Sequence, residues 1–192
     1  MAITKRIPVG ISARHVHVSR EDLDILYGPG YQLTVRKDLS QPGQFAAEET
    51  VDLVTEKGNF KKVRILGPER KQTQIEISLT DSLKLGIKPP VRDSGNLAGS
   101  PGITVVGPQG SIQLKQGVIV ACRHIHMTAA DAAELGVKDK QMVQVCCGGE
   151  RGLTFGNVLI RVNDSFRLEM HVDTDESNAA MFNANTVIEI VK

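Results

Sequence analysis

Short runs of β-branched and other apolar residues, separated by glycine, proline and polar residues, recur along the chain. Several runs alternate apolar and polar positions, as residues 74–79 (QIEISL) do, and this is the period of a strand with one buried face. Many short strands with turn residues between them favour antiparallel sandwiches or barrels. We expect strands at residues 7–11, 32–35, 50–54, 62–66, 74–79, 102–106, 117–121, 142–145, 157–162, 167–172 and 186–191.

Helix signals are few, and two of them are clear. Ser19 and Thr128 are each followed three residues later by an aspartate. A hydroxyl in that place can cap a backbone N–H, and the carboxylate favours the positive end of a helix. The expected helix bodies and their glycine stops are residues 23–26 with Gly28 and residues 132–135 with Gly136.

One segment of the sequence occurs twice. Residues 13–19 (ARHVHVS) match residues 122–128 (CRHIHMT), and in both copies an apolar strand precedes the motif and a capped helix follows it. A later pair also aligns, residues 74–81 with residues 169–176, if Glu76 is placed opposite His171. We interpret this pattern as two related β-units in one chain, each built from the strands of its own repeat.

The five histidines of the chain all lie in this repeated pattern. In an extended backbone, His15 and His17 point to one face, and so do His124 and His126. Neutral imidazole is a good ligand for Zn, Co, Ni, Cu or Fe, and two imidazoles make half of a metal site. One such pair would be weak evidence, but the duplicated pair predicts metal binding.

A third ligand for each pair must come from elsewhere, and the repeat offers Glu76 and His171 at equivalent places. One site would then hold His15, His17 and Glu76, and the other His124, His126 and His171. Three protein ligands leave a coordination position open, which is typical of a catalytic metal. From the residues alone, Glu76 can equally be a solvated side chain on an alternating strand. Cys122 is either a further ligand or, as is more common for a small thiol, a buried residue.

Three arginines lie close to these motifs in the sequence. Arg70 precedes the strand with Glu76, where its planar donors would match the oxygens of a phosphate. The alternative is that residues 56–71, which are rich in lysine and arginine, form a solvated face. Arg14 and Arg123 point to the strand face opposite their neighbouring histidines, and we interpret them as structural ion pairs.

Composition and charge exclude several classes of protein. The 192 residues carry 23 Lys and Arg against 22 Asp and Glu, so the net charge of +1 gives no reason to bind nucleic acid or an anionic membrane. The longest wholly apolar run, residues 118–122, is too short to span a bilayer. No secretion signal opens the chain and three cysteines make no disulfide framework, so we expect a cytoplasmic protein. The glycine-rich residues 41–44 and 94–102 match no nucleotide-binding loop, and we expect loops there, with a lid or an interdomain contact as the alternative.

Several motifs together resemble the PduL-type phosphate propanoyltransferases, which are phosphotransacylases. The resemblance covers nearly the whole chain, and its motifs follow one another in the family's order. They are residues 14–19 (RHVHVS), 39–47 (LSQPGQFAA), 67–70 (GPER), 94–97 (SGNL), 123–128 (RHIHMT) and 167–176 (RLEMHVDTDE).

The resemblance implies an enzyme that converts acyl-CoA and phosphate, reversibly, into acyl phosphate and CoA. It also implies a mainly β fold of two β-barrel domains with short capping helices, in which the N-terminal strand is exchanged into the C-terminal barrel. Barrel one would comprise residues 4–13 and 122–192, and barrel two residues 14–121, with residues 28–48 as a small sheet or lid. This arrangement departs from the simple tandem repeat.

The same resemblance assigns roles to individual residues. The family's two divalent metal ions, usually zinc, would be held by the two triads named above, and the phosphate-binding arginine matches Arg70. Contacts to coenzyme A would match Ser12, Lys37, Arg64, Leu66 and Asn178. The partners are thus coenzyme A, acyl-CoA and phosphate, with no nucleic acid and no membrane, and the β-rich edges allow a homodimer.

The physiological setting is less constrained. The family serves propanediol degradation, and relatives that enter bacterial microcompartments often carry an N-terminal extension. Only about six residues precede Ile7 here, which favours a free cytoplasmic enzyme and makes acetyl-CoA as plausible a substrate as propanoyl-CoA.

In the expected mechanism, the metal pair polarises the thioester carbonyl and stabilises the leaving thiolate while Arg70 holds phosphate for attack. No serine or cysteine stands out as a nucleophile, so we expect direct transfer in a ternary complex, with an acyl-enzyme as the alternative. The competing functions are a dimetal thioester hydrolase, a cupin-like single-metal protein and a metal-binding module without activity.

Overall fold

The computed structural model describes residues 5–191, and their backbone divides into two compact units. The first, which we call the C-terminal unit, contains the described residues up to Ser12, the short segment Ser40–Pro42, and the chain from Cys122 onward. The second, which we call the central unit, contains Ala13–Leu39 and Gly43–Ala121. Each unit has its own hydrophobic core.

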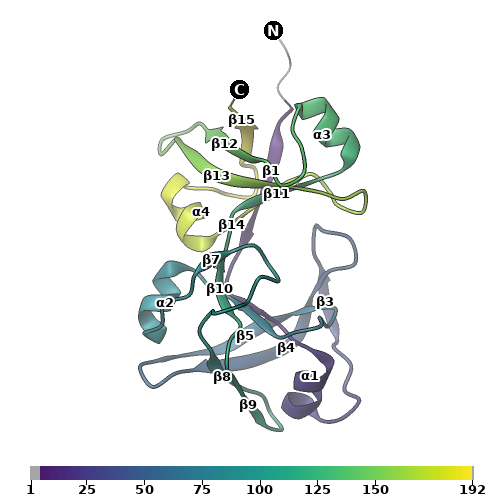
Figure 1. Cartoon of the computed structure of the whole chain (residues 1–192), viewed down its shortest axis with the longest axis vertical. Helices are drawn as coiled ribbons and strands as arrows, with labels where there is room; N and C mark the ends of the chain where they lie inside the picture. The colour runs from purple at the N-terminus through teal and green to yellow at the C-terminus, as the bar shows by residue number, and fades with distance from the viewer. Residues whose placement is uncertain (1–4, 192) are drawn as a thin grey trace. The chain divides into compact units, whose positions relative to one another are not determined.

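The C-terminal unit is a closed barrel with the strand order β1-β14-β11-β13-β12-β15 (Figure 1). Two short helices, α3 and α4, accompany the barrel. The elements are β1 (Ile7–Ser12), β11 (His124–Met127), α3 (Ala129–Leu135), β12 (Met142–Cys147), β13 (Leu153–Val162), β14 (Glu169–Asp173), α4 (Thr174–Ala180) and β15 (Val187–Ile190).

The N-terminal strand belongs to this C-terminal barrel. Strand β1 runs parallel to β14, with Gly10 opposite His171, and antiparallel to β15, with Ile7 opposite Ile188. Ile7 and Ile188 are completely buried, so the pairing places β1 in the barrel core. The predicted strand exchange is therefore confirmed, and the simple tandem repeat, in which each strand stays with its own repeat, is wrong for β1.

The central unit is built on a nine-stranded sheet with the order β7-β10-β6-β2-β5-β4-β8-β9, to which β3 adds by pairing with β4. This sheet forms a half-barrel, whereas the sheet of the C-terminal unit closes. The predicted mainly β fold is confirmed. The elements are β2 (His15–His17), α1 (Arg20–Tyr27), β3 (Val35–Asp38), β4 (Phe45–Val54), β5 (Asn59–Gly67), β6 (Gln74–Glu76), α2 (Leu79–Leu85), β7 (Val91–Arg92), β8 (Ile103–Val106), β9 (Ser111–Leu114) and β10 (Val118–Ala121).

Both predicted helices are present, with the expected caps. Ser19 caps α1 and Gly28 ends it, and Thr128 caps α3 with Gly136 at its end. The predicted strand at residues 74–79 is too long, because Ser78 caps α2 and its hydroxyl accepts a hydrogen bond from the Asp81 N–H. A strand cannot continue through a residue whose side chain closes the first turn of a helix.

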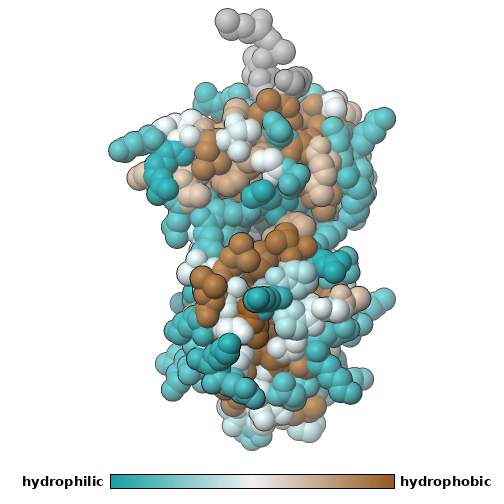
Figure 2. Space-filling view, turned by 60° about the vertical axis from the view of Figure 1, so that its left-hand side comes forward, coloured by the Kyte–Doolittle hydropathy of each residue, from teal (hydrophilic) through white to brown (hydrophobic). Residues whose placement is uncertain are grey.

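The face drawn in Figure 2 carries hydrophilic side chains interspersed with hydrophobic patches. Exposed apolar side chains of the central unit include Leu79 and Leu83 on α2, of which Leu83 is 81% exposed, and Val91 on β7. Among residues 5–191, the structure contains no helix that is long and apolar enough to cross a membrane.

Candidate metal centres

His15, His17 and Glu76 form one cluster, which we call the central cluster. Strands β2 and β6 pair antiparallel with His15 directly opposite Glu76, so the pairing itself brings the third residue to the histidines. The Nε2 atoms of His15 and His17 lie 3.2 Å apart. They lie 3.5 and 3.8 Å, respectively, from oxygens of the Glu76 carboxylate. Three potential ligand atoms therefore converge within 4.8 Å of one another.

Backbone carbonyls fix how the two imidazoles of the central cluster face it. The Nδ1 of His15 lies 2.9 Å from the Ala13 carbonyl oxygen, and the Nδ1 of His17 lies 3.2 Å from that of Leu66. A carbonyl can only accept, so each Nδ1 carries the proton and each Nε2 keeps its lone pair. Metal-binding histidines are commonly oriented in this way.

The electrostatics of the central cluster favour a neutral His17 and an ionised Glu76, as a metal requires. Burial would lower the pKa of His15, but the neighbouring Glu76 outweighs burial and raises that pKa. Burial, together with the nearby His15 and Arg70, lowers the pKa of His17 to about 3, so its imidazole is neutral at pH 7. Burial alone would raise the pKa of Glu76, but the charges of His15, His17 and Arg70 outweigh it and hold that pKa far below its usual range. One carboxylate and neutral imidazole nitrogens are a donor set suited to zinc or another transition metal.

His124, His126 and His171 form the second cluster, which we call the C-terminal cluster. Strands β11 and β14 pair antiparallel with His124 opposite His171, which repeats the arrangement of the central unit. The ring centroids lie 4.6 to 5.2 Å apart, and a potential ligand atom of each ring lies within 4.8 Å of the others. The Nδ1 of His124 is 2.7 Å from the Cys122 carbonyl oxygen, so Nε2 is its ligand atom.

The imidazole of His126 adds a second observation that fits a metal ion. Its Nδ1 is buried and has no hydrogen-bond partner among residues 5–191. Burial and the charges of His124, His171 and Arg161 lower the pKa of His126 to about 2, so the ring is neutral. A buried polar atom without a partner costs free energy, and a bound metal ion would give this neutral ring a partner. The three imidazoles therefore fit a metal ion.

Arg70 lies beside the central cluster, as the sequence led us to expect. Its Nη1 donates a hydrogen bond of 3.0 Å to Ser94 Oγ, and Ser94 in turn donates one of 3.2 Å to Glu76. Gln74 donates to the same Ser94 oxygen at 2.8 Å and to Glu76 at 2.5 Å. Ser94 and Gln74 were missed in the sequence, because Ser94 lies in a glycine-rich loop and nothing there marked its partners.

Arg14 and Arg123 make the predicted ion pairs. An Nη2 of Arg14 lies 2.6 Å from Asp81, and an Nη1 of Arg123 lies 2.7 Å from Glu176. Both carboxylates also close the capping box of the helix that follows the third ligand of their cluster. In both units, an arginine just before the H-x-H strand is thus tied to the helix that follows the third ligand of the cluster.

The residues predicted to contact coenzyme A divide between the units. Ser12 ends β1 and the exposed Asn178 lies on α4, both in the C-terminal unit. The exposed Lys37 lies on β3, and Arg64 and Leu66 lie on β5 in the central unit. Arg64 is opposite His15 in the parallel pairing and donates to the carbonyls of Ala47 and Glu48. The coenzyme role of these residues stays a prediction.

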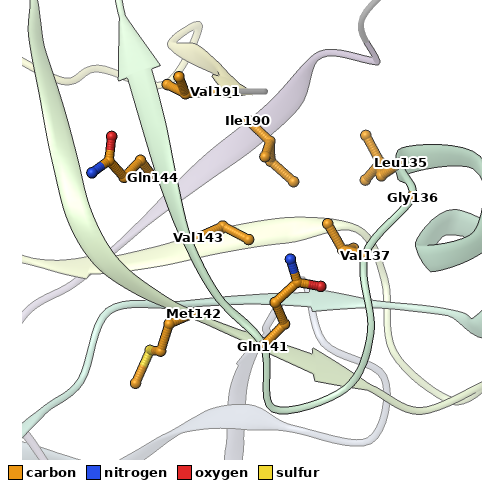
Figure 3. Close-up of a pocket in the computed structure, with 9 residues that line it drawn as sticks. All are labelled: Leu135, Gly136, Val137, Gln141, Met142, Val143, Gln144, Ile190 and Val191. Carbon is orange, nitrogen blue, oxygen red and sulfur yellow. The ribbon is translucent and has the colours of Figure 1, made fainter.

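Two other features lie apart from the clusters. Cys122 contributes its carbonyl to His124, but its thiol is not among the converging ligand atoms. A pocket of the C-terminal unit is lined mostly by apolar side chains (Figure 3). No lining residue is titratable, so the pocket offers no acid–base or metal chemistry: Leu135, Gly136, Val137, Gln141, Met142, Val143, Gln144, Ile190 and Val191.

Comparison with known proteins gives one consistent result. The family model described as phosphate propanoyltransferase matches residues 8–183. A protein of that name from Thermotoga maritima is 57% identical over 187 residues, which cover 97% of this chain and 89% of the relative. A phosphate propanoyltransferase from Rhodopseudomonas palustris is 51% identical over 97% of this chain and 83% of the relative. One from Salmonella typhimurium is 54% identical over 91% of this chain and 83% of the relative.

These matches cover nearly the full length of the chain, including both clusters and Arg70. They confirm the resemblance noted in the sequence motifs and identify an acyltransferase enzyme with phosphate acyltransferase activity. The chain belongs to the phosphate propanoyltransferase family.

Proposed function

We propose that this enzyme exchanges the acyl group of propanoyl-CoA or acetyl-CoA between the CoA sulfur and phosphate, reversibly, with the help of two divalent metal ions, which we take to be Zn²⁺. The observation that carries the proposal is the pair of clusters, each with three convergent ligand atoms, one of them beside Arg70. Three protein ligands in each cluster leave a coordination position for substrate. We also take the two compact units as the two domains of the enzyme.

The chain's own residues would divide the work. His15, His17 and Glu76 would hold one ion, and His124, His126 and His171 the other. When bound, the two ions would polarise the thioester carbonyl and stabilise the thiolate that leaves. In the forward direction a phosphate oxygen forms a bond to the acyl carbon, the carbon–sulfur bond breaks, and the sulfur keeps the electron pair.

Arg70 would bind and orient the attacking phosphate. Its guanidinium is partly buried, and the hydrogen bond to Ser94 holds one edge of it beside Glu76. A planar guanidinium offers paired donors to phosphate oxygens and offsets their negative charge. By the resemblance of the motifs to the family, Lys37 and Arg64 would bind the phosphates of coenzyme A, with Ser12, Leu66 and Asn178 as its further contacts.

We favour direct transfer from sulfur to phosphate over an acyl-enzyme. A serine nucleophile needs a free lone pair and a base that takes its proton. Ser94 lies beside the central cluster, but its oxygen accepts hydrogen bonds from Arg70 and Gln74 and its proton is directed to Glu76. Both lone pairs of that hydroxyl are therefore engaged.

The test combines metal analysis with turnover in one preparation. We expect about two metal ions per chain and release of CoA from propanoyl-CoA or acetyl-CoA that depends strictly on phosphate. The ratio of the two rates identifies the preferred acyl group. Release that ignores phosphate would instead support the alternative function, a dimetal thioester hydrolase.

The role of Arg70 has its own test. Arg70→Ala is expected to raise the KM for phosphate at least tenfold, whereas Arg151→Ala, which removes an exposed arginine from a turn of the C-terminal unit, serves as the matched control. An unchanged phosphate KM in Arg70→Ala would remove Arg70 from the site.

We also propose that the enzyme is a homodimer, because Leu79 and Leu83 present apolar side chains on one short helix of the central unit. The molar mass in solution tests this, and Leu83→Glu should lower it to that of one chain. A monomeric wild type would contradict the proposal.

A further inference from the structure

In each cluster, the third ligand is hydrogen-bonded to the residue two positions before it on the same strand. The Nε2 of His171 lies 2.7 Å from Oε2 of Glu169 on β14. The Nε2 of Gln74 lies 2.5 Å from Oε1 of Glu76 on β6. Residues two apart on a strand share a face, so this contact is built into the backbone.

The chemistry of each partner is matched to its ligand. A carboxylate only accepts, so the Nε2–H of His171 donates a hydrogen bond to Glu169, and Nδ1 keeps its lone pair. The other oriented imidazoles are the reverse, because the Nδ1 atoms of His15 and His124 face backbone carbonyls. Glu76 can only accept, and it is paired with an amide that donates.

Several contacts hold Glu169 in place. The Ser40 hydroxyl donates to the same carboxylate oxygen that accepts from His171. Gly10 lies opposite His171 in the neighbouring strand β1. A Cβ at Gly10 would lie 3.0 Å from the Glu169 carboxyl carbon and 3.1 Å from Cδ2 of His171. Glycine at this position therefore leaves the room in which the pair packs against β1.

Gln74 is held just as firmly. Its Oε1 accepts the Gly95 N–H at 2.7 Å, which sets the orientation of the amide. Its Nε2 then donates one hydrogen to Glu76 and the other to Ser94. All the hydrogen-bonding groups of this buried amide are directed by their neighbours.

We propose that Glu169 is a positioning residue that makes Nδ1 the metal-binding atom of His171, and that Gln74 is its counterpart for Glu76. The inference rests on the metal sites of the proposed function and concerns residues to which neither the sequence motifs nor the comparisons assign a role. Partners of this kind commonly change metal affinity by about 10- to 100-fold.

The first experiment measures zinc affinity by competition with a chromophoric chelator. Glu169→Ala should weaken one of the two bound ions by about 10- to 100-fold and leave the other unchanged. Glu169→Gln should fall between Glu169→Ala and the wild type, because a carboxamide oxygen still accepts a hydrogen bond. Glu150→Ala, which changes an exposed loop glutamate of the same unit, is the matched control.

The second experiment reads the imidazole itself and needs no metal. In protein with ¹⁵N-labelled histidine, long-range proton–nitrogen correlation spectra show which ring nitrogen carries the proton. The apo wild type should carry it on Nε2 of His171, and Glu169→Ala should show a mixture of both forms. A proton on Nδ1 in the wild type would overturn the proposal.

A swap of partners tests the matched chemistry. Glu76→His alone places an imidazole beside the donating amide of Gln74, so the central cluster should bind zinc at least tenfold more weakly. Adding Gln74→Glu recreates the Glu169–His171 arrangement and should recover affinity. If the double variant binds no better than Glu76→His, the matching of partner to ligand is wrong.

Zinc binding by the wild type distinguishes a failure of the proposed metal sites from a failure of the positioning role. A wild type that binds no zinc contradicts the proposed metal sites, whatever the variants do. A wild type that binds two ions, with Glu169→Ala folded and of unchanged affinity, refutes the positioning role alone. Should Glu169→Ala not fold, Glu169→Gln and the tautomer of the apo wild type still decide it.

Discussion

Removal of one hydroxyl, in Ser94→Ala, should uncouple Arg70 from the central cluster. The Ser94 oxygen accepts from Arg70 at 3.0 Å and from Gln74 at 2.8 Å, and its proton is directed to Glu76 at 3.2 Å. One donor and two lone pairs are thus all in use. The substitution leaves a guanidinium N–H and an amide N–H without this acceptor, while Glu76 loses a donor.

The magnitude follows from the kind of hydrogen bond that is lost. A hydrogen bond to a charged group contributes about 1.5–3 kcal/mol. Arg70 is only partly buried, so water replaces a share of the lost contact and the lower end of that range applies. A loss of about 1.4 kcal/mol is a tenfold change. We therefore expect kcat/KM for phosphate to fall roughly tenfold, mainly through KM.

The assay measures initial rates of CoA release from propanoyl-CoA while phosphate is varied. Ser111→Ala, on the exposed side of β9 in the same unit, controls for the loss of a serine hydroxyl. Ser94→Thr keeps the hydroxyl and should recover part of the loss. If the phosphate KM of Ser94→Ala equals that of Ser111→Ala, Ser94 does not position the phosphate-binding arginine.

Three further predictions concern stability. Tyr27→Phe removes a hydroxyl that donates to the Thr50 carbonyl and accepts from the Thr50 N–H, and should cost about 1–3 kcal/mol in denaturant unfolding; no change in midpoint would contradict this. Burial would raise the pKa of Asp131, but hydrogen bonds from Lys5 and Thr128 outweigh burial and lower that pKa. The stabilisation that the ionised Asp131 provides is therefore present above the ordinary pKa of 3.8 and is lost as the pH falls below that value. Unfolding free energy measured against pH should therefore fall less in acid for Asp131→Asn than for the wild type, and parallel curves would refute this. Removing both proposed zinc ions with a chelator should lower Tm by about 10–20 °C relative to protein at 100 times Kd, because each ion contributes about 2.7 kcal/mol at that concentration, and an unchanged Tm would show that zinc does not bind the folded chain.

Much of the fold could be predicted because its strands have one buried face. β12, for example, alternates exposed and buried residues throughout, and its pattern is visible in the sequence. β3 could not be placed correctly, because all four of its residues are exposed and no hydrophobic period marks them. The second helix, α2, was hidden because Ser78 follows an alternating run, which made a cap look like a continuing strand.

The candidate ligands could be predicted for a different reason. The two H-x-H pairs lie on strands, and the repeat aligned Glu76 with His171 before any pairing was known. In the structure these two residues lie opposite His15 and His124, respectively. Ser94 gave no such signal, because it reaches Glu76 through the return of a loop 18 residues later in the chain.

The two halves of the repeat differ at one informative place. Where the central unit has Gln74 and Glu76, the C-terminal unit has Glu169 and His171. A carboxylate ligand beside a carboxylate partner would have no proton to share and would repel it, so a change of ligand from glutamate to histidine requires a change of partner from donor to acceptor. The backbone arrangement is the same in both units, with the third ligand opposite the first histidine. The ligand and its partner thus differ together between the two halves of the repeat. The sequence contains both differences, but only the hydrogen bonds show which residue pairs with which ligand.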